Sequence, residues 1–291
     1  MTERLETKLI KESWVKPNEF IKAKEEQQKS GKSLYSTLIR MNFMTEEDVY
    51  MFFAQHALIP FLRISDYELD PELLSFFPEA LYRENYFLPI FKVENIMYVC
   101  MANPLDAGLV STLTMQATDL EIYPVFGTPS AIQGAVNAFF GPDDKYFDLE
   151  DLIVSPQGLG LMPFWRESER LSIKLPVDFK PVDERVKLVS SSYVSATVLD
   201  ISASGNALGI RTFIFLPPYS KVMIKFPSKD SSYEASAEVV RCNLERGGRY
   251  FLGVKFLEIR EDIIKSILAE VKQVPDWKAE IDPPSDGPIG G

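Results

Sequence analysis

The sequence has few of the residues on which most enzyme chemistry depends. Its 291 residues include one histidine, His56, and two cysteines, Cys100 and Cys242. A single histidine offers one candidate base for a catalytic triad and cannot form a zinc cluster. The two isolated thiols form no metal-binding or disulfide pattern, which favours a reducing, cytoplasmic location. We therefore expect no metal site, and we expect His56, on an amphipathic helix, to be structural rather than catalytic.

Long apolar runs and an excess of positive charge are also missing. No segment approaches the ~20 apolar residues of a membrane-spanning helix, and charges interrupt the first ten residues, so we expect no signal peptide. The chain has 31 Lys and Arg against 42 Asp and Glu, a formal net charge of −11. Only residues 166–272 are mildly basic, with 17 Lys and Arg against 14 Asp and Glu. We therefore expect no DNA or RNA binding through a broad basic face, whereas a few local arginines could hold a small anion.

Two patterns that resemble enzyme motifs lack required parts. The sequence SGKS at Ser30–Ser33 ends like a phosphate-binding loop, but Glu26 occupies the position of the first glycine. It also falls between predicted helices rather than after a strand, which a nucleotide-binding loop requires. The acidic residues at Asp143, Asp144 and 46–48 are interpreted as solvated loop and helix-cap residues. Together with the single histidine, these features predict a protein that is not an enzyme.

The N-terminal residues 1–141 predict a helical repeat followed by a small α/β module. Residues 1–57 contain four short helices, and apolar positions recur at an offset of about 29 residues. The recurring pairs include Leu5 and Leu34, Leu9 and Leu38, and Trp14 and Phe43. Residues 58–141 then alternate short strands and helices, beginning with a candidate strand at 59–64.

The C-terminal half predicts a different architecture. Residues 142–165 form an acidic connector marked by proline and glycine. Six segments of alternating polarity then run through residues 166–272, the third of them over 207–215, and an amphipathic helix ends the series. This pattern is typical of a six-stranded antiparallel β-barrel with a closing helix. The tail 273–291 is rich in proline and glycine and is expected to be flexible. The predicted fold class is therefore α+β, with two domains.

Two short motifs about thirty residues apart carry the strongest functional signal. The first, RxxxR, comprises Arg166 and Arg170 just before the first predicted barrel strand. The second, DxSxxG, supplies Asp200, Ser202 and Gly205 at the end of the second strand. In this order, on this strand pattern, the barrel segment resembles the PilZ domain, a bacterial receptor for cyclic di-GMP. The resemblance implies that the two arginines clasp the ligand from a flexible segment while the DxSxxG residues line the barrel surface.

Each motif also has a structural interpretation. Arginine and glutamate at such spacings often decorate a solvated helix, and Asp200 and Ser202 are residue types that stabilise turns. Ligand chemistry fits the same residues, because an arginine fork matches guanine O6 and N7 or a phosphate. A carboxylate at Asp200 can accept from guanine N–H groups, Ser202 adds a hydroxyl, and Gly205 permits close backbone approach. The presence of both motifs together favours the ligand site.

The residue before the first motif bears on stoichiometry. Many PilZ members have an arginine there, which in the family accompanies binding of a stacked ligand dimer. Here the position is Trp165. By resemblance to members with a bulky apolar residue, Trp165 implies one ligand molecule per domain. The alternative is that Trp165 packs the connector against the barrel.

Residues 1–141 resemble the N-terminal domain of type II secretion and pilus-assembly ATPases. The resemblance rests on the helical repeat, on MANPLD at Met101–Asp106 and on GTPSAI near the end of the module. Some members bind cyclic di-GMP through a repeated motif, of which Arg4 and Gln27 are present here. Glu6 and Ser13 replace its glycines in the first copy, and in the second Tyr35 and Asn42 replace them while Ser33 replaces the arginine. Arg4 and Gln27 therefore mark only a second candidate site. Protein docking is the favoured role of this module.

The combined features predict a non-catalytic cyclic di-GMP receptor that acts on a protein partner in pilus, secretion or motility control. No other cofactor is expected. The main alternative is a ligand-independent adaptor, in which both domains serve as docking surfaces. A regulatory subunit that binds an ATPase in trans is compatible with either hypothesis.

Overall fold

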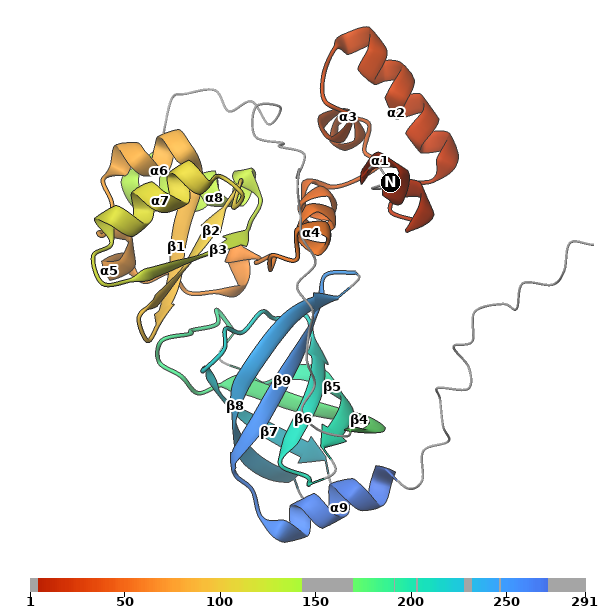
Figure 1. Cartoon of the computed structure of the whole chain (residues 1–291), viewed down its shortest axis with the longest axis vertical. Coiled ribbons are helices and arrows are strands. Elements are labelled where there is room, and N and C mark those ends of the chain that lie inside the picture. Colours follow the sequence, from red (N-terminus) through yellow and green to blue (C-terminus); the bar gives the residue numbers. More distant parts are fainter. Residues whose placement is uncertain are drawn as a thin grey trace, which may run out of the picture.

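The computed structural model describes residues 5–142, 170–190, 192–202, 204–227, 232–245 and 247–271. Most of the predicted connector and the tail therefore lie outside the described residues. Within the described part, no helix is long and apolar enough to cross a membrane. The fold is α+β, as predicted, and combines N-terminal helices, a small sheet and a closed barrel (Figure 1).

The predicted helical repeat forms four helices with a core of their own. They are α1 (Leu5–Lys11), α2 (Pro17–Ser30), α3 (Leu34–Arg40) and α4 (Glu46–Ala57). Thr45 caps α4 by accepting a hydrogen bond from the Asp48 amide, and the Asp48 carboxylate accepts one from the Thr45 amide. The SGKS sequence forms the turn between α2 and α3, where Gly31 has a φ of 72° and Ser33 caps α3. It is therefore a helix connection rather than a phosphate loop, as predicted.

The two copies of the repeat share an unusual backbone turn. Ser13, after α1, has a φ of 60°, and Asn42, after α3, has a φ of 55°. The following residues close the turn in the same way, since Trp14 N donates to Leu9 O and Phe43 N donates to Leu38 O. The repeat therefore keeps a left-handed residue at both helix ends although neither position is a glycine.

Replacing Ser13 with glycine is expected to stabilise the protein by about 0.5–1 kcal/mol. A serine in the left-handed region has a steric cost that glycine avoids. Relief of this cost exceeds the loss of stability that comes from the greater conformational entropy of glycine in the unfolded chain. The variant Asn42→Gly is the matched comparison and should gain less, because asparagine tolerates this region. Urea unfolding followed by circular dichroism measures both. A Ser13→Gly protein less stable than wild type would contradict the argument.

The α/β module contains a three-stranded sheet in the order β1-β2-β3. The strands are β1 (Phe87–Val93), β2 (Ile96–Met101) and β3 (Glu121–Phe126). The helical elements are η1 (Ile64–Asp66), α5 (Pro71–Leu74), α6 (Glu79–Asn85), α7 (Ala107–Gln116) and α8 (Pro129–Phe140). Strands β1 and β2 are antiparallel, whereas α7 connects β2 to β3 as a parallel pair. The predicted strand at 59–64 is wrong: it is reduced to one bridge between Phe61 and Phe126, because the chain turns into η1 at Ile64.

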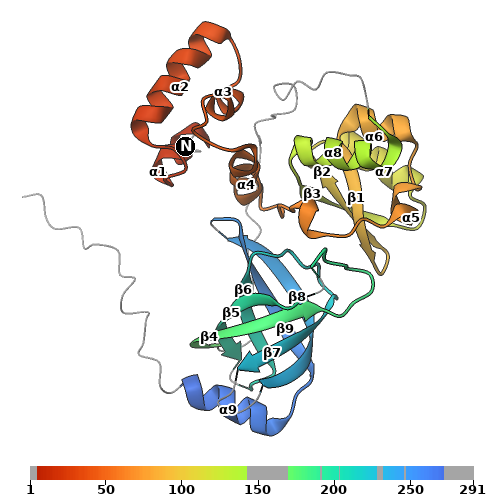
Figure 2. The same cartoon turned by 180° about the vertical axis from the view of Figure 1, so that it is seen from behind.

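The six predicted barrel strands close in the order β4-β5-β6-β9-β8-β7, with every pair antiparallel. They are β4 (Arg170–Pro181), β5 (Val194–Ser202), β6 (Ala207–Thr212), β7 (Lys221–Pro227), β8 (Ser232–Glu245) and β9 (Arg249–Glu258). Helix α9 (Glu261–Val271) covers one end by burying Ile263 and Ile267. Seen from both sides, α9 lies at the end of the barrel opposite α4 (Figures 1 and 2). The predicted barrel and closing helix are confirmed.

One barrel strand is shorter than predicted, and the reason is tertiary. Strand β6 ends at Thr212, whose hydroxyl accepts a hydrogen bond from the Ile214 amide. The next residues leave the barrel wall, and Phe215, 2% exposed, packs between the barrel and the small sheet. Its ring centroid is 5.7 Å from that of Tyr250 in β9, 6.1 Å from Tyr98 in β2 and 6.4 Å from Phe91 in β1.

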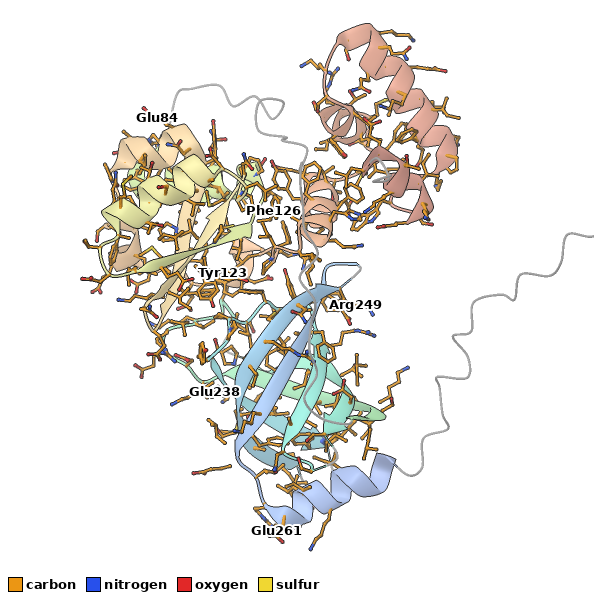
Figure 3. The ribbon with its side chains drawn as sticks, in the orientation of Figure 1. Glu84, Tyr123, Phe126, Glu238, Arg249 and Glu261 are labelled. Carbon is orange, nitrogen blue, oxygen red and sulfur yellow. The ribbon has the colours of Figure 1, made fainter. Side chains whose placement is uncertain are left out.

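The α/β module and the barrel therefore share one continuous core, whereas α1–α4 surround a second core. The Tyr67 hydroxyl donates to the Phe215 carbonyl at 2.6 Å. Backbone bonds also join the two parts, from Glu68 N to Lys187 O and from Val189 N to Asp66 O. Phe126 lies between the small sheet and α4 (Figure 3). The domain boundaries stay a prediction, but packing groups the sheet module with the barrel.

Candidate ligand site on the outer face of the barrel

Two β-bulges lie in the same part of the barrel wall, one on β5 and one on β8, with β6 and β9 between them. They define the candidate site. The register of β5 shifts between Val198 and Asp200, and that of β8 shifts between Val239 and Arg241. A bulge adds one residue to a strand and changes the direction of the side chain that follows it. Asp200 then pairs with Gly209 of β6, and Arg241 pairs with Gly253 of β9. Because Gly209 and Gly253 pair with each other, these four residues form one row across four strands.

The two glycines of this row, Gly209 and Gly253, form a floor on which larger side chains lie. A Cβ at Gly209 would be 2.7 Å from both Asp200 carboxylate oxygens and 2.4 Å from the Phe251 ring. A Cβ at Gly253 would be 2.8 Å from Arg241 Cγ. The Arg241 guanidinium is 5.3 Å from the centroid of the Phe251 ring. The glycine floor thus holds an aromatic ring with a carboxylate on one side and a guanidinium on the other.

The predicted site residues occupy different places in this arrangement. Asp200 lies in the row itself, while Ser202 is 3% exposed and accepts a hydrogen bond from the Ala207 amide at 3.0 Å. Gly205 has a φ of 74°, and a Cβ there would be 2.4 Å from Ile264 of α9. Ser202 and Gly205 therefore shape the β5–β6 turn and seat the closing helix. Their part in ligand binding stays a prediction.

The second arginine of the RxxxR motif is the first residue of β4. Arg170 begins β4 and pairs with Ser202, and Ser172 pairs with Asp200. The start of β4 therefore lies beside the Asp200 end of the row. The Arg170 side chain, Arg166 and Trp165 lie outside the described residues, so their roles stay predictions.

Sequence reasoning missed Phe251 and Arg241. A usable signal was present, because Gly209 and Gly253 interrupt predicted strands, and a glycine inside a strand often marks a bulge or a close approach. Pairing the two glycines requires the barrel order, in which β6 and β9 are neighbours although they are far apart in the sequence. Their alignment was therefore not visible in the linear pattern.

The histidine and the two cysteines, which the sequence offered as candidates for catalysis or metal binding, have surroundings typical of structural residues. Lys8 Nζ is 3.3 Å from His56 Nδ1, and Glu12 Oε2 is 3.3 Å from His56 Nε2, so His56 joins α4 to the start of the chain. Burial raises the pKa of the Cys100 and Cys242 thiols, which keeps both in the weakly nucleophilic protonated form. Among the described side chains, no group of three or more His, Cys, Asp or Glu is placed to hold a metal ion.

The second candidate site near the N-terminus contains a competing carboxylate. Lys24 Nζ is 2.7 Å from a Glu6 oxygen and donates to Gln27 Oε1 at 3.1 Å. Glu6 thus supplies the negative charge that an anionic ligand would bring to Lys24. Arg4 lies outside the described residues, and this site stays a prediction.

The chain matches two domain families, the MshEN domain over residues 58–145 and the PilZ domain over residues 165–273. A curated relative, the type IV pilus assembly ATPase PilB of Myxococcus xanthus (strain DK1622), is 23% identical over 202 residues. That match covers 69% of this chain and 35% of PilB, so the chain spans about a third of the relative's length.

Solved structures resemble each half of the chain. A structure of MshE with cdg is 23% identical, has a TM-score of 0.40 and covers 47% of this chain and 99% of its own. The PilZ domain of YcgR from Escherichia coli, solved with c-di-GMP, is 15% identical, has a TM-score of 0.26 and covers 40% of this chain and 98% of its own.

Proposed function

We propose that this chain, which joins an MshEN domain to a PilZ domain, is a non-catalytic cyclic di-GMP receptor. It would transmit binding to a protein partner in pilus, secretion or motility control. The observation that carries the proposal is the glycine floor at Gly209 and Gly253, with Asp200, Phe251 and Arg241 around it. Asp200, at one end of this row, pairs with Ser172 of β4, the strand that begins with the second arginine of the RxxxR motif.

The chemistry of this row suits a guanine nucleotide. The Asp200 carboxylate can accept hydrogen bonds from guanine N–H donors, and the Phe251 ring offers a face for base stacking. Arg241 can stack on the opposite face of a base or hold a phosphate, since guanidinium does both. In this proposal Arg166 and Arg170, the first residue of β4, supply the remaining positive charge. Ser202 and Gly205 would act mainly by setting the turn that presents Asp200.

The proposal is tested by calorimetric titration of cyclic di-GMP into the whole protein. We expect one ligand molecule per chain, as Trp165 implies, and an affinity about tenfold to a hundredfold weaker for Asp200→Ala. That range corresponds to the loss of a hydrogen bond to a charged group. Asp178→Ala is the matched control, because Asp178 also points outward from the barrel and accepts a hydrogen bond from the nearby Ser195 hydroxyl at 2.8 Å.

One result would count against the receptor and another against its site. Absence of both heat and a thermal shift with the wild-type protein would rule out ligand binding, and the ligand-independent adaptor would then be preferred. The internal use of Ser202 and Gly205 in the fold is compatible with that adaptor. Equal weakening in Asp200→Ala and Asp178→Ala would instead place the ligand away from the glycine floor. Pull-down against pilus and secretion ATPases, with and without cyclic di-GMP, would then test the partner.

A further inference from the structure

An ion pair borders the glycine floor and has no part in the site described so far. Arg211 lies on β6 two residues after Gly209, so both point to the outer face of the barrel. Its Nε is 2.5 Å from Glu245 Oε2, and its Nη2 is 3.3 Å from Glu245 Oε1. Arg211 also pairs in register with Phe251. A guanidinium fork therefore lies next to the ring on which a base would stack, with a carboxylate as its partner.

The carboxylate partner belongs to the β8–β9 hairpin, which touches the helical lobe formed by α1–α4. Glu245 is the last residue of β8, and β9 begins at Arg249. Between them, a Cβ at Gly248 would be 2.4 Å from Met51 Sδ of α4 and 3.3 Å from Arg63 Nη2. Arg63 in turn pairs with Glu47 of α4. Arg249 marks this end of the barrel, beneath α4 (Figure 3).

Helix α4 joins the second core to the rest of the molecule. Its Glu46 carboxylate accepts a hydrogen bond from Ser130 at the start of α8, and Tyr50 contacts Phe126 at 6.3 Å between ring centroids. Leu244, adjacent to Glu245, packs against both cores. The β8–β9 hairpin therefore contacts α4 directly, and a change in the hairpin can reach the helical lobe through this helix.

We propose that the Arg211–Glu245 pair couples nucleotide binding on the barrel to the helical lobe. A phosphate group of the ligand takes the Arg211 fork from Glu245, and the β8–β9 hairpin, having lost this tie, loosens against α4. The exchange is feasible because the side chains are 37% and 30% exposed, and an ion pair at that exposure contributes little to stability. A phosphate accepts the same two-pronged geometry as a carboxylate and carries its charge into the site. This inference rests on the proposed function.

The first test compares affinities for cyclic di-GMP by calorimetry. Glu245→Gln removes the competitor and is expected to bind two- to fivefold tighter, the range of a partly exposed ion pair. Glu238→Gln is the matched control, since it removes the same charge from the same strand at a distance from Arg211. It should stay within about 1.5-fold of wild type. Arg211→Ala should bind at least about fivefold more weakly.

The second test is hydrogen exchange measured by mass spectrometry on the full chain. Ligand is expected to speed exchange in the β8–β9 hairpin and in α4, and Glu245→Gln should show part of that increase without ligand. Tight binding by wild type with unchanged exchange in α4, or Glu245→Gln binding no tighter than Glu238→Gln, would overturn the coupling and leave the receptor intact. Absence of binding by wild type would overturn both.

Discussion

Replacing Phe215 with alanine is expected to lower the free energy of unfolding by about 3–5 kcal/mol, the range for a fully buried phenylalanine. Its ring touches aromatic side chains from both the barrel and the small sheet, at centroid distances of 5.7–6.4 Å. The cavity would therefore open in the shared core rather than in one domain. Urea unfolding followed by intrinsic fluorescence and circular dichroism measures the loss.

Phe213→Ala is the matched control, because Phe213 lies two residues away and is 52% exposed. Its expected cost is below about 1 kcal/mol. For the wild-type protein, the shared core predicts that the sheet module and the barrel unfold in one transition. If Phe215→Ala destabilised only one of two separable transitions and by no more than Phe213→Ala, the shared core would not hold in solution.

The second large effect concerns the two arginines of the RxxxR motif. Arg166→Ala and Arg170→Ala are each expected to weaken cyclic di-GMP binding tenfold to a hundredfold, since one arginine fork to a base contributes about 1–3 kcal/mol. The described barrel core is formed by apolar side chains, so the thermal stability of both variants without ligand should stay close to that of wild type. Calorimetric titration gives the affinities and thermal unfolding gives the stability.

Arg260→Ala provides the control for charge. Arg260 is 72% exposed, pairs with Asp262 and lies next to α9. Removing it changes the net charge by the same amount and should alter affinity less than twofold. A loss under threefold for both Arg166→Ala and Arg170→Ala would exclude the RxxxR segment from the binding site. Binding at the glycine floor would then have to rest on Asp200, Phe251 and Arg241 alone.

The sequence alone determined the order and type of most elements. Strand alternation and turn residues are local, so they predicted six barrel strands and a closing helix that the structure confirms. The helical repeat was equally visible, because its apolar spacing recurs and its helix ends carry cap residues such as Thr45. The two motifs of the site could be proposed from spacing, and Asp200 lies where a surface residue of the barrel was expected.

Only the tertiary structure decided how these elements meet. The predicted third strand failed at its end because Phe215 gains more by burial between two sheets than by continuing the barrel wall. Arg241 reaches the row of Asp200 through a bulge, and a bulge shifts strand register by an amount that alternation does not reveal. Likewise, Gly209 and Gly253 become one floor only when β6 pairs with β9, a contact between residues 44 positions apart. Local preferences act on neighbours in the chain, whereas the candidate site is built from non-local pairing.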